Sequence, residues 1–287
     1  MVNYLNSDFF CPYMTFKAGP KELLHEIGKG GYSTVYNGVG LKDDRLVEYA
    51  LKRYDPTDSG IWAAQSEFDI YQEIIRIPEY TRFFPELLEA KLEKEKDIYE
   101  LYLSFEPNQN PETMSDRERI QYLYNAAISL YVLHKHEIIH ADITTHNILG
   151  DGKLSDFGIA VDLNGKNSAL AKRDHNNSLV GSLGYIAPET LKFSYVTTWS
   201  DLYMFSSVVY EILLDRELYD GFSATQVRLF KEDEEKYNRF LDAILLDDIS
   251  GIYGERIGSI VKSGLSYHAE DRPFEISEYI NVFSEYL

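Results

Sequence analysis

Short runs of β-branched and aromatic residues separated by polar ones occupy much of the first hundred residues, and this pattern is typical of strands. The runs predict four strands, over residues 22–28, 33–38, 47–52 and 97–106. Between the third and fourth runs, over 62–77, apolar residues recur at the spacing of one helix face: Ala64, Ile70, Tyr71, Ile74 and Ile77. Pro78 follows directly and is expected to end this helix.

From Ser115 onward the apolar residues mostly follow the helical period. Ser115 and Glu118 fit a capping box ahead of an apolar stripe, and a second long helix is expected over 200–214. The change of pattern falls at the polar run FEPNQNP, residues 105–111. We therefore expect an α+β protein with a β-rich N-terminal lobe, residues 1–106, and a mainly helical C-terminal lobe, residues 107–287.

The chain carries a large excess of negative charge. Its 287 residues include 28 Lys and Arg against 47 Asp and Glu, which gives a formal net charge of −19. Such a charge repels phosphate backbones and anionic lipids, so nucleic acid is not an expected partner. We interpret most of the excess as solvated surface, with the run KEDEEK at 231–236 as an example. The 23 tyrosines are interpreted as core lining with accessible hydroxyls.

No apolar run approaches the roughly 18 residues that a membrane span needs, and the start, MVNYLNSDFFCPYM, lacks the basic region of a signal peptide. We therefore expect a soluble, intracellular protein without membrane insertion. The single cysteine, Cys11, excludes an internal disulfide and a zinc site built on paired cysteines.

A glycine-rich segment, GKGGYSTV, runs from Gly28 to Val35 between two predicted strands. Glycines at this place let the backbone of a hairpin approach the oxygens of a triphosphate without obstruction by side chains, and a plain glycine-rich turn is the alternative. No Gly-Lys-Ser/Thr sequence follows, which excludes a Walker loop. The strand that follows disfavours a dinucleotide-binding fold.

Ala50 and Lys52 lie on one face of the third predicted strand, because side chains alternate with a period of two. A lysine beside a small apolar residue is suited to reach phosphates over an adenine, and an exposed edge lysine is the alternative. On the helix over 62–77, Glu67 falls near the centre of the apolar stripe and Glu73 on its flank. A carboxylate that faces the core needs a cation, so we predict an ion pair between Lys52 and Glu67.

Three further motifs follow in order. They are HADITTHN at 140–147, DFG at 156–158 and GSLGYIAPE at 181–189. Together with the glycine-rich segment and Lys52, they resemble the catalytic loop, metal loop and activation-segment end of eukaryotic-type Ser/Thr protein kinases. The resemblance extends from Gly28 to Arg272 and implies the bilobal protein-kinase fold, with an activation segment over 156–189.

The resemblance implies the chemistry as well: transfer of the γ-phosphoryl group of ATP to Ser or Thr hydroxyls of proteins, with Mg²⁺ or Mn²⁺. Asp142 matches the catalytic base, and Lys52, paired with Glu67, matches the phosphate clamp. Asn147 and Asp156 match the two metal ligands. The implied nucleotide-binding residues are Gly28, Lys29, Gly30, Gly31, Tyr32, Ser33, Val35, Ala50, Lys52, Glu106 and Asn108.

The adenine is expected at the lobe boundary. If Phe105 guards the pocket, Glu106 provides a backbone carbonyl and Asn108 a backbone N–H. A register shifted by one residue would demand an N–H from Pro107, which has none.

Other matches imply structural roles. Asp201, on the helix over 200–214, matches the buried aspartate that anchors the catalytic loop, and Arg272 matches the arginine that pairs with Glu189. Ser182 matches a hydroxyl that bonds the catalytic aspartate.

The chain departs from the family pattern at three positions. Ala141 stands where most regulated protein kinases carry the arginine that pairs with a phosphorylated activation segment, and Thr144 stands where Ser/Thr kinases usually carry a lysine. Ser33 replaces the third glycine of the glycine-rich segment. Because Ala141 has no donor for a phosphate, we expect activity without phosphorylation of residues 156–189.

The loop HADITTHN also resembles the His-Gly-Asp loop of small-molecule phosphotransferases and of the atypical kinase in the KEOPS tRNA-modification complex, but those relatives generally lack a segment like that at 181–189. Three functions stay open: an active Ser/Thr protein kinase, a kinase of small molecules or an atypical target, and a catalytically inactive interaction module. The complete set of Lys52, Asp142, Asn147 and Asp156 favours the first. We expect a protein substrate that is not acidic and a cytoplasmic location, with delivery into a host cell as an alternative setting. The oligomeric state and phosphorylation of tyrosine stay open.

Overall fold

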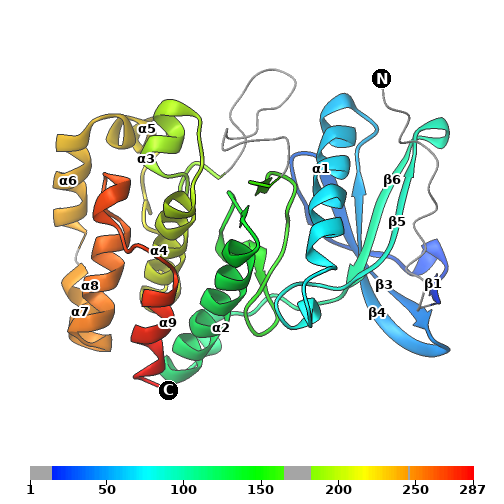
Figure 1. Ribbon diagram of the computed structural model, residues 1–287, viewed down its shortest axis with the longest axis horizontal. Coiled ribbons are helices and arrows are strands. Elements are labelled where there is room, and N and C mark those ends of the chain that lie inside the picture. Colours follow the sequence, from blue (N-terminus) through cyan, green and yellow to red (C-terminus); the bar gives the residue numbers. More distant parts are fainter. Residues whose placement is uncertain (1–14, 165–181, 245) are drawn as a thin grey trace. The chain divides into compact units, whose positions relative to one another are not determined.

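The computed structural model describes residues 15–164, 182–244 and 246–287. The chain divides into two compact units, residues 1–107 and 108–287, with the boundary one residue beyond the expected position. The described part of the first unit is a β-sheet with one long helix, and the described part of the second is mainly helical (Figure 1). The expected α+β class is confirmed.

An antiparallel sheet forms the N-terminal unit. Its hydrogen-bonded strands follow the order β1, β3, β4, β6, β5, and β2 also pairs with β3. The strands are β1 (Phe16–Ala18), β2 (His25–Lys29), β3 (Ser33–Lys42), β4 (Arg45–Tyr54), β5 (Leu87–Glu93) and β6 (Ile98–Ser104). The helix α1 (Asp58–Ile74) contacts β4, β5 and β6 and lies alongside the sheet in Figure 1.

The bounds of α1 differ from the predicted range of 62–77. Its start is set by Thr57, whose side chain accepts a hydrogen bond from the backbone N–H of Gly60 at 3.2 Å. After Ile74 the chain tightens into a turn in which the N–H of Ile77 donates to the carbonyl of Ile74 at 2.9 Å. Ile77 is nevertheless buried, so the apolar spacing predicted the burial correctly and the helix end wrongly.

Two strands of the sheet are absent from the prediction. β5 has the sequence LLEAKLE, which is rich in residues that favour helices, and it is a strand because it pairs with β6. β1 is a short strand that pairs with the end of β3. The predicted strand over 22–28 is also wrong in part, because Lys21–Leu23 form a 3-10 turn and β2 begins only at His25.

Helices dominate the described part of the C-terminal unit. They are α2 (Asp116–Lys135), α3 (Pro188–Phe193), α4 (Thr198–Leu214), α5 (Ala224–Glu232), α6 (Glu234–Ala243), α7 (Leu246–Tyr253), α8 (Glu255–Gly264) and α9 (Ser277–Ser284). The predicted capping box of Ser115 and Glu118 is present at the start of α2. α4 contacts α2, α7 and α8 and is the central helix of this unit, because its residues 200–210 are all buried. None of the helices in the described ranges has the length and apolar character needed to cross a membrane.

Two short strand pairs hold the loops that carry the motifs. β7 (Ile138–Ile139) pairs with β10 (Val161–Asp162), and β8 (Ile148–Leu149) pairs with β9 (Lys153–Leu154). The hydroxyl of Tyr122, on α2, donates to the carbonyl of Ile148 at 2.7 Å. The loops HADITTHN and DFG therefore begin and end on paired backbone that is attached to α2.

Candidate active site

Val35, Ala50 and Lys52 lie on one face of the sheet in the N-terminal unit. Val35 on β3 is directly opposite Lys52 on β4, and Ala50 precedes Lys52 by two residues on the same strand. The face therefore presents a lysine beside two small apolar side chains, as the period of two predicts.

Lys52 and Glu67 form the expected ion pair. The Lys52 ammonium donates to Glu67 Oε2 at 2.6 Å, and the hydroxyl of Tyr54 donates to the same oxygen. Both members of the pair are buried, whereas the side chain of Glu73 is 42% exposed and binds Arg76. Tyr54 is not among the residues predicted from the sequence, although the period of two places it on the same strand face as Lys52. The catalytic role of the pair stays a prediction.

The glycine-rich segment comprises the end of β2, a turn and the start of β3. The N–H of Gly30 donates to the carbonyl of Ser33 at 2.8 Å, and Ser33 is buried. Gly28 and Gly31 have no positive φ, and a Cβ at either would meet no atom of the described residues within 4 Å. Neither backbone conformation nor packing against the described residues requires glycine at these two positions, and the close approach of a nucleotide stays a prediction.

The other nucleotide-binding candidates are exposed or half-buried. Lys29 is exposed at the end of β2, and Tyr32 is half-buried. Glu106 follows β6, and its carboxylate accepts a hydrogen bond from the hydroxyl of Ser104 at 3.2 Å. Asn108 is exposed and begins the C-terminal unit. Their contacts with a nucleotide stay predictions.

Asp201 of α4 holds the backbone of the catalytic loop. Its Oδ2 accepts a hydrogen bond from the N–H of His140, and its Oδ1 accepts one from the N–H of Ala141, both at 2.8 Å. The ring of His134 lies 2.8 Å from the same Oδ2. The anchoring role expected for Asp201 is confirmed. These bonds also stabilise Ala141 at a φ of 66°, which residues other than glycine seldom adopt.

Asp142 is held from two sides. The amide nitrogen of Asn147 donates to the Asp142 carbonyl at 2.8 Å and to its Oδ2 at 3.3 Å, and the N–H of Ser182 donates to Oδ1 at 3.3 Å. Burial raises the pKa of Asp142, the negative charge of Asp156 raises it further, and hydrogen bonds from Ser182 oppose the shift. An oriented carboxylate of raised pKa suits a base that takes the proton of a hydroxyl.

Asn147 and Asp156 offer the hard oxygen atoms that Mg²⁺ and Mn²⁺ prefer. Since the amide nitrogen of Asn147 is bound to Asp142, its amide oxygen is the atom able to ligate a cation. The carboxylates of Asp142 and Asp156 repel each other, and a bound divalent cation would reduce this repulsion. Among the described residues, no cluster of three or more His, Cys, Asp or Glu could hold a metal by itself. Asn147 and Asp156 therefore offer two oxygen donors that fit a divalent cation, which would take its remaining ligands from outside these side chains.

His140 joins the catalytic loop to the metal loop. Its Nε2 lies 3.0 Å from the carbonyl of Ser155, and its ring contacts that of Phe157 with 5.3 Å between centroids. Both rings are fully buried. In the metal loop, the N–H of Gly158 donates to Asp156 Oδ1 at 3.4 Å, and Asp156 has a φ of 64°. The two loops therefore form one packed body within the C-terminal unit.

Glu189 and Arg272 form a buried bidentate ion pair. The two terminal nitrogens of Arg272 donate to the two carboxylate oxygens of Glu189 at 2.8 and 2.7 Å. Arg272 also donates to the carbonyls of Ser266 and Trp199, at 2.9 and 3.0 Å. The pairing expected from the sequence is confirmed, and it attaches the start of α3 to the segment before α9.

Arg272→Met is expected to lower the free energy of unfolding by about 3–5 kcal/mol, because it leaves the buried carboxylate of Glu189 without its counter-charge. Arg239→Met is the matched control, since Arg239 pairs with Glu235 on the exposed face of α6 and should cost less than about 1 kcal/mol. Denaturant unfolding of the two variants beside the wild type measures both values. Equal stabilities of the two variants would contradict the structural role of the buried pair.

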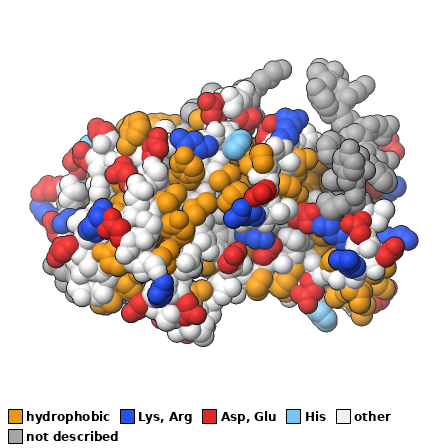
Figure 2. Space-filling view, turned by 60° about the horizontal axis from the view of Figure 1, so that its bottom comes forward, with side chains coloured by type: hydrophobic (Ala, Val, Ile, Leu, Met, Phe, Trp, Pro, Cys, Tyr) orange, Lys and Arg blue, Asp and Glu red, His pale blue; other side chains and the backbone are white. Residues whose placement is uncertain are grey.

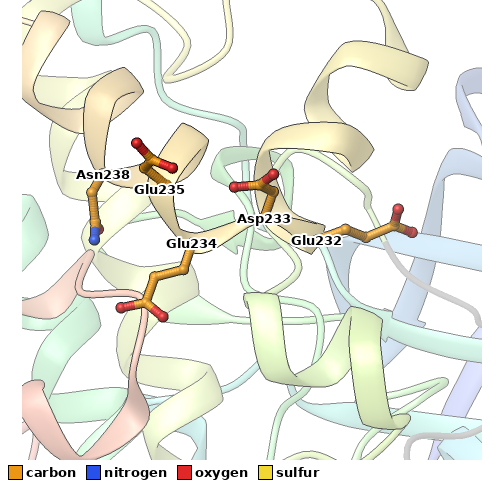
Figure 3. Close-up of a pocket in the computed structure, with 5 residues that line it drawn as sticks. All are labelled: Glu232, Asp233, Glu234, Glu235 and Asn238. Atoms are coloured by element: carbon orange, nitrogen blue, oxygen red, sulfur yellow. The ribbon is translucent and has the colours of Figure 1, made fainter.

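The acidic run at 231–236 is solvated except at its first residue. A pocket of about 500 Å³ is lined by Glu232, Asp233, Glu234, Glu235 and Asn238. Figure 3 shows these carboxylates spreading in different directions, and Figure 2 shows acidic and basic side chains interspersed over the face in view. Lys231, however, is fully buried, so the prediction of a solvated run is wrong for this residue. Acidic residues follow Lys231 in the sequence, but on α5 it lies four residues after the buried Val227, and this helical spacing is a signal that could have indicated its burial.

The family of the chain follows from comparison with known proteins. A family model described as "Protein kinase domain" matches residues 22–273. The chain belongs to the protein kinase family. The bilobal α+β fold expected from the motifs is the fold of this kinase domain.

Similar proteins occur in bacteria and plants. The serine/threonine-protein kinase PrkC of Bacillus subtilis is 27% identical over 230 residues, which cover 74% of this chain and 33% of PrkC. The probable serine/threonine-protein kinase PknB of Lactococcus lactis is 29% identical, over 72% of this chain and 33% of its own length. The LysM domain receptor-like kinase 3 of Arabidopsis thaliana is 30% identical, over 67% of this chain and 30% of its own length. The chain thus spans about a third of the length of these relatives.

Proposed function

We propose that this kinase domain uses ATP to phosphorylate Ser and Thr hydroxyls of protein substrates. The observation that carries the proposal is the environment of Asp142, a half-buried carboxylate that Asn147 and Ser182 orient beside the charge of Asp156. The names of the bacterial relatives PrkC and PknB support serine/threonine phosphorylation.

Residues of the N-terminal unit bind the nucleotide in this proposal. Lys52, held by Glu67 and Tyr54, binds the phosphates through its ammonium. Gly28 and Gly31 leave their backbone open to the phosphate oxygens. Because Glu67 is fully buried, its carboxylate keeps Lys52 charged and limits its rotation.

Residues of the C-terminal unit act on the phosphate and the acceptor. The Asn147 amide oxygen and the Asp156 carboxylate hold the divalent cation, which supplies charge neutralisation on the phosphate oxygens when bound. Asp142 accepts the proton of the substrate hydroxyl as that oxygen attacks the γ-phosphorus, and the bond from the γ-phosphorus to the bridging oxygen breaks, so that ADP leaves. Asn147 and Ser182 keep the Asp142 carboxylate in the orientation that this transfer needs.

Incubation of the purified protein with Mg²⁺, labelled ATP and a peptide array tests the proposal. We expect label on Ser and Thr peptides with neutral or basic flanks, since a net charge of −19 repels acidic ones. Transfer to small molecules only, or no transfer at all, would overturn it. A cytoplasmic location for the whole protein stays a prediction.

Phosphatase-treated protein is expected to keep most of its activity, within about twofold of the untreated protein. The reason is that Ala141 has no side-chain donor for a phosphate in the segment 156–189. A Ser168→Ala, Ser178→Ala double variant, at two positions outside the described residues, should likewise stay active. A large drop that autophosphorylation restores would show that another basic group takes the place of the missing arginine.

A further inference from the structure

Lys231 of α5 is a buried lysine whose ammonium binds only backbone carbonyls and tyrosine rings in the described contacts. Its Nζ donates to the carbonyls of Leu183 and Gly184 at 2.8 Å and of Ile186 at 2.7 Å. The rings of Tyr203 and Tyr219 lie against it, with 5.4 and 4.7 Å from Nζ to their centroids. Its exposed fraction is 0%.

The hydrogen-bond pattern favours a charged Lys231. An ammonium has three N–H bonds, which match the three carbonyls, whereas a neutral amine could serve only two of them. Burial lowers the pKa of Lys231 well below its usual value, and the negative charge of Glu189 opposes this shift. Burying an ammonium without a counter-ion costs free energy of folding. The three hydrogen bonds and the two aromatic rings offset this cost only while the carbonyls keep their positions. The turn that supplies them is therefore rigidly held.

This turn, residues 182–186, is also attached to the catalytic loop. The N–H of Ser182, at its start, donates to Asp142. The hydroxyl of Tyr185 donates to Glu211 of α4, and Thr145 of the catalytic loop donates to the same carboxylate at 3.1 Å. Lys231 thus holds a turn that is also hydrogen-bonded to the candidate base, Asp142.

Gly184 leaves the outer side of the turn open. It has no positive φ, and a Cβ at this position would meet no atom of residues 15–164, 182–244 or 246–287 within 4 Å. Packing against the described part of the unit therefore does not require glycine here. Because the N–H of Ser182 lies 3.3 Å from Asp142 Oδ1, a substrate whose hydroxyl reaches Asp142 comes close to this turn, and at Gly184 no side chain would keep its chain from the backbone.

We propose that Lys231 is a positioning residue for the protein substrate: by binding three carbonyls of residues 183–186, it holds the turn over which the substrate lies beside Asp142. The proposal rests on the proposed function. Lys231 is expected to affect binding of the peptide and not of ATP. Its hydrogen bonds go to the turn, and in the described contacts none goes to Lys52, Asn147 or Asp156.

The test is a comparison of Lys231→Met with Lys231→Gln and with Lys236→Met. Lys236→Met is the matched control, because Lys236 belongs to the same charged run and its side chain is 55% exposed. The readouts are the KM for the best peptide from the array, the KM for ATP and the rate of ATP hydrolysis without peptide. Circular dichroism reports the fold of each variant.

Lys231→Met is expected to raise the peptide KM about tenfold or more and to leave the ATP KM and the hydrolysis rate within about twofold of wild type. Lys231→Gln should recover part of the loss, since its amide can still donate to two carbonyls. Lys236→Met should behave as wild type.

An unchanged peptide KM in Lys231→Met, or an equal loss of ATP hydrolysis, would overturn the role of Lys231 and leave the proposed function standing. Unfolding of both Lys231 variants would also overturn it, because Lys231 would then be a folding residue. A wild-type protein that phosphorylates no peptide would overturn the proposed function, and this inference with it.

Discussion

Asp142→Asn is expected to lower the rate of peptide phosphorylation by about 10²–10⁴-fold while the C-terminal unit stays folded. The substitution keeps the volume of the side chain and removes its basicity, so the substrate hydroxyl loses its proton acceptor. The fold should survive, because the bond from the Asn147 amide to the backbone carbonyl of residue 142 at 2.8 Å does not depend on the side chain. Neutralising Asp142 also removes its repulsion with Asp156, so the affinity for the metal–nucleotide complex should not fall sharply.

Steady-state kinetics with the best peptide, together with circular dichroism, measure this effect. Asp220→Asn is the control, since Asp220 is exposed and lies in the turn after α4. It should retain wild-type kcat and KM for both substrates. Wild-type turnover by a folded Asp142→Asn protein would contradict the assignment of Asp142 as the base.

Glu67→Gln is expected to reduce kcat/KM about tenfold or more. The neutral amide has the size of the carboxylate, but it no longer supplies the charge that Lys52 binds at 2.6 Å in a buried site. The Lys52 ammonium is then less firmly oriented toward the phosphates. A loss of about 1.4 kcal/mol in transition-state stabilisation already amounts to the tenfold effect. The KM for ATP should rise, because Lys52 is assigned to the phosphates.

Glu73→Gln is the matched control on the same helix. The Glu73 side chain is 42% exposed and binds Arg76 one turn away, so this variant should keep activity within about twofold. Thermal unfolding of both variants separates loss of activity from loss of fold. Reversed effects of the two substitutions would assign the functional pair to Glu73 and contradict the position of Glu67.

The spacing of apolar and polar residues predicted a residue's position correctly where that position depends on a single helix or strand. The apolar stripe placed Glu67 on the buried side of α1, and the period of two placed Lys52 on the face that it reaches. The capping box at Ser115 predicted the start of α2 correctly, because its two reciprocal bonds form within one helical turn. The same approach failed for β5, whose composition favours a helix and whose strand conformation depends on pairing with β6.

The sequence by itself determined the family, the order of the motifs and the identity of the charged residues at the candidate site, since these depend on residue type and spacing. Only the tertiary structure decided that Tyr54 and Lys52 bind the same oxygen of Glu67. It also decided that Lys231, unlike the exposed residues of its charged run, is buried and binds three carbonyls. Such contacts join residues 13 to 48 positions apart in the chain. Periodicity indicates the face of its own element on which a residue lies, but it does not identify the residues that it binds, because those partners lie on other elements.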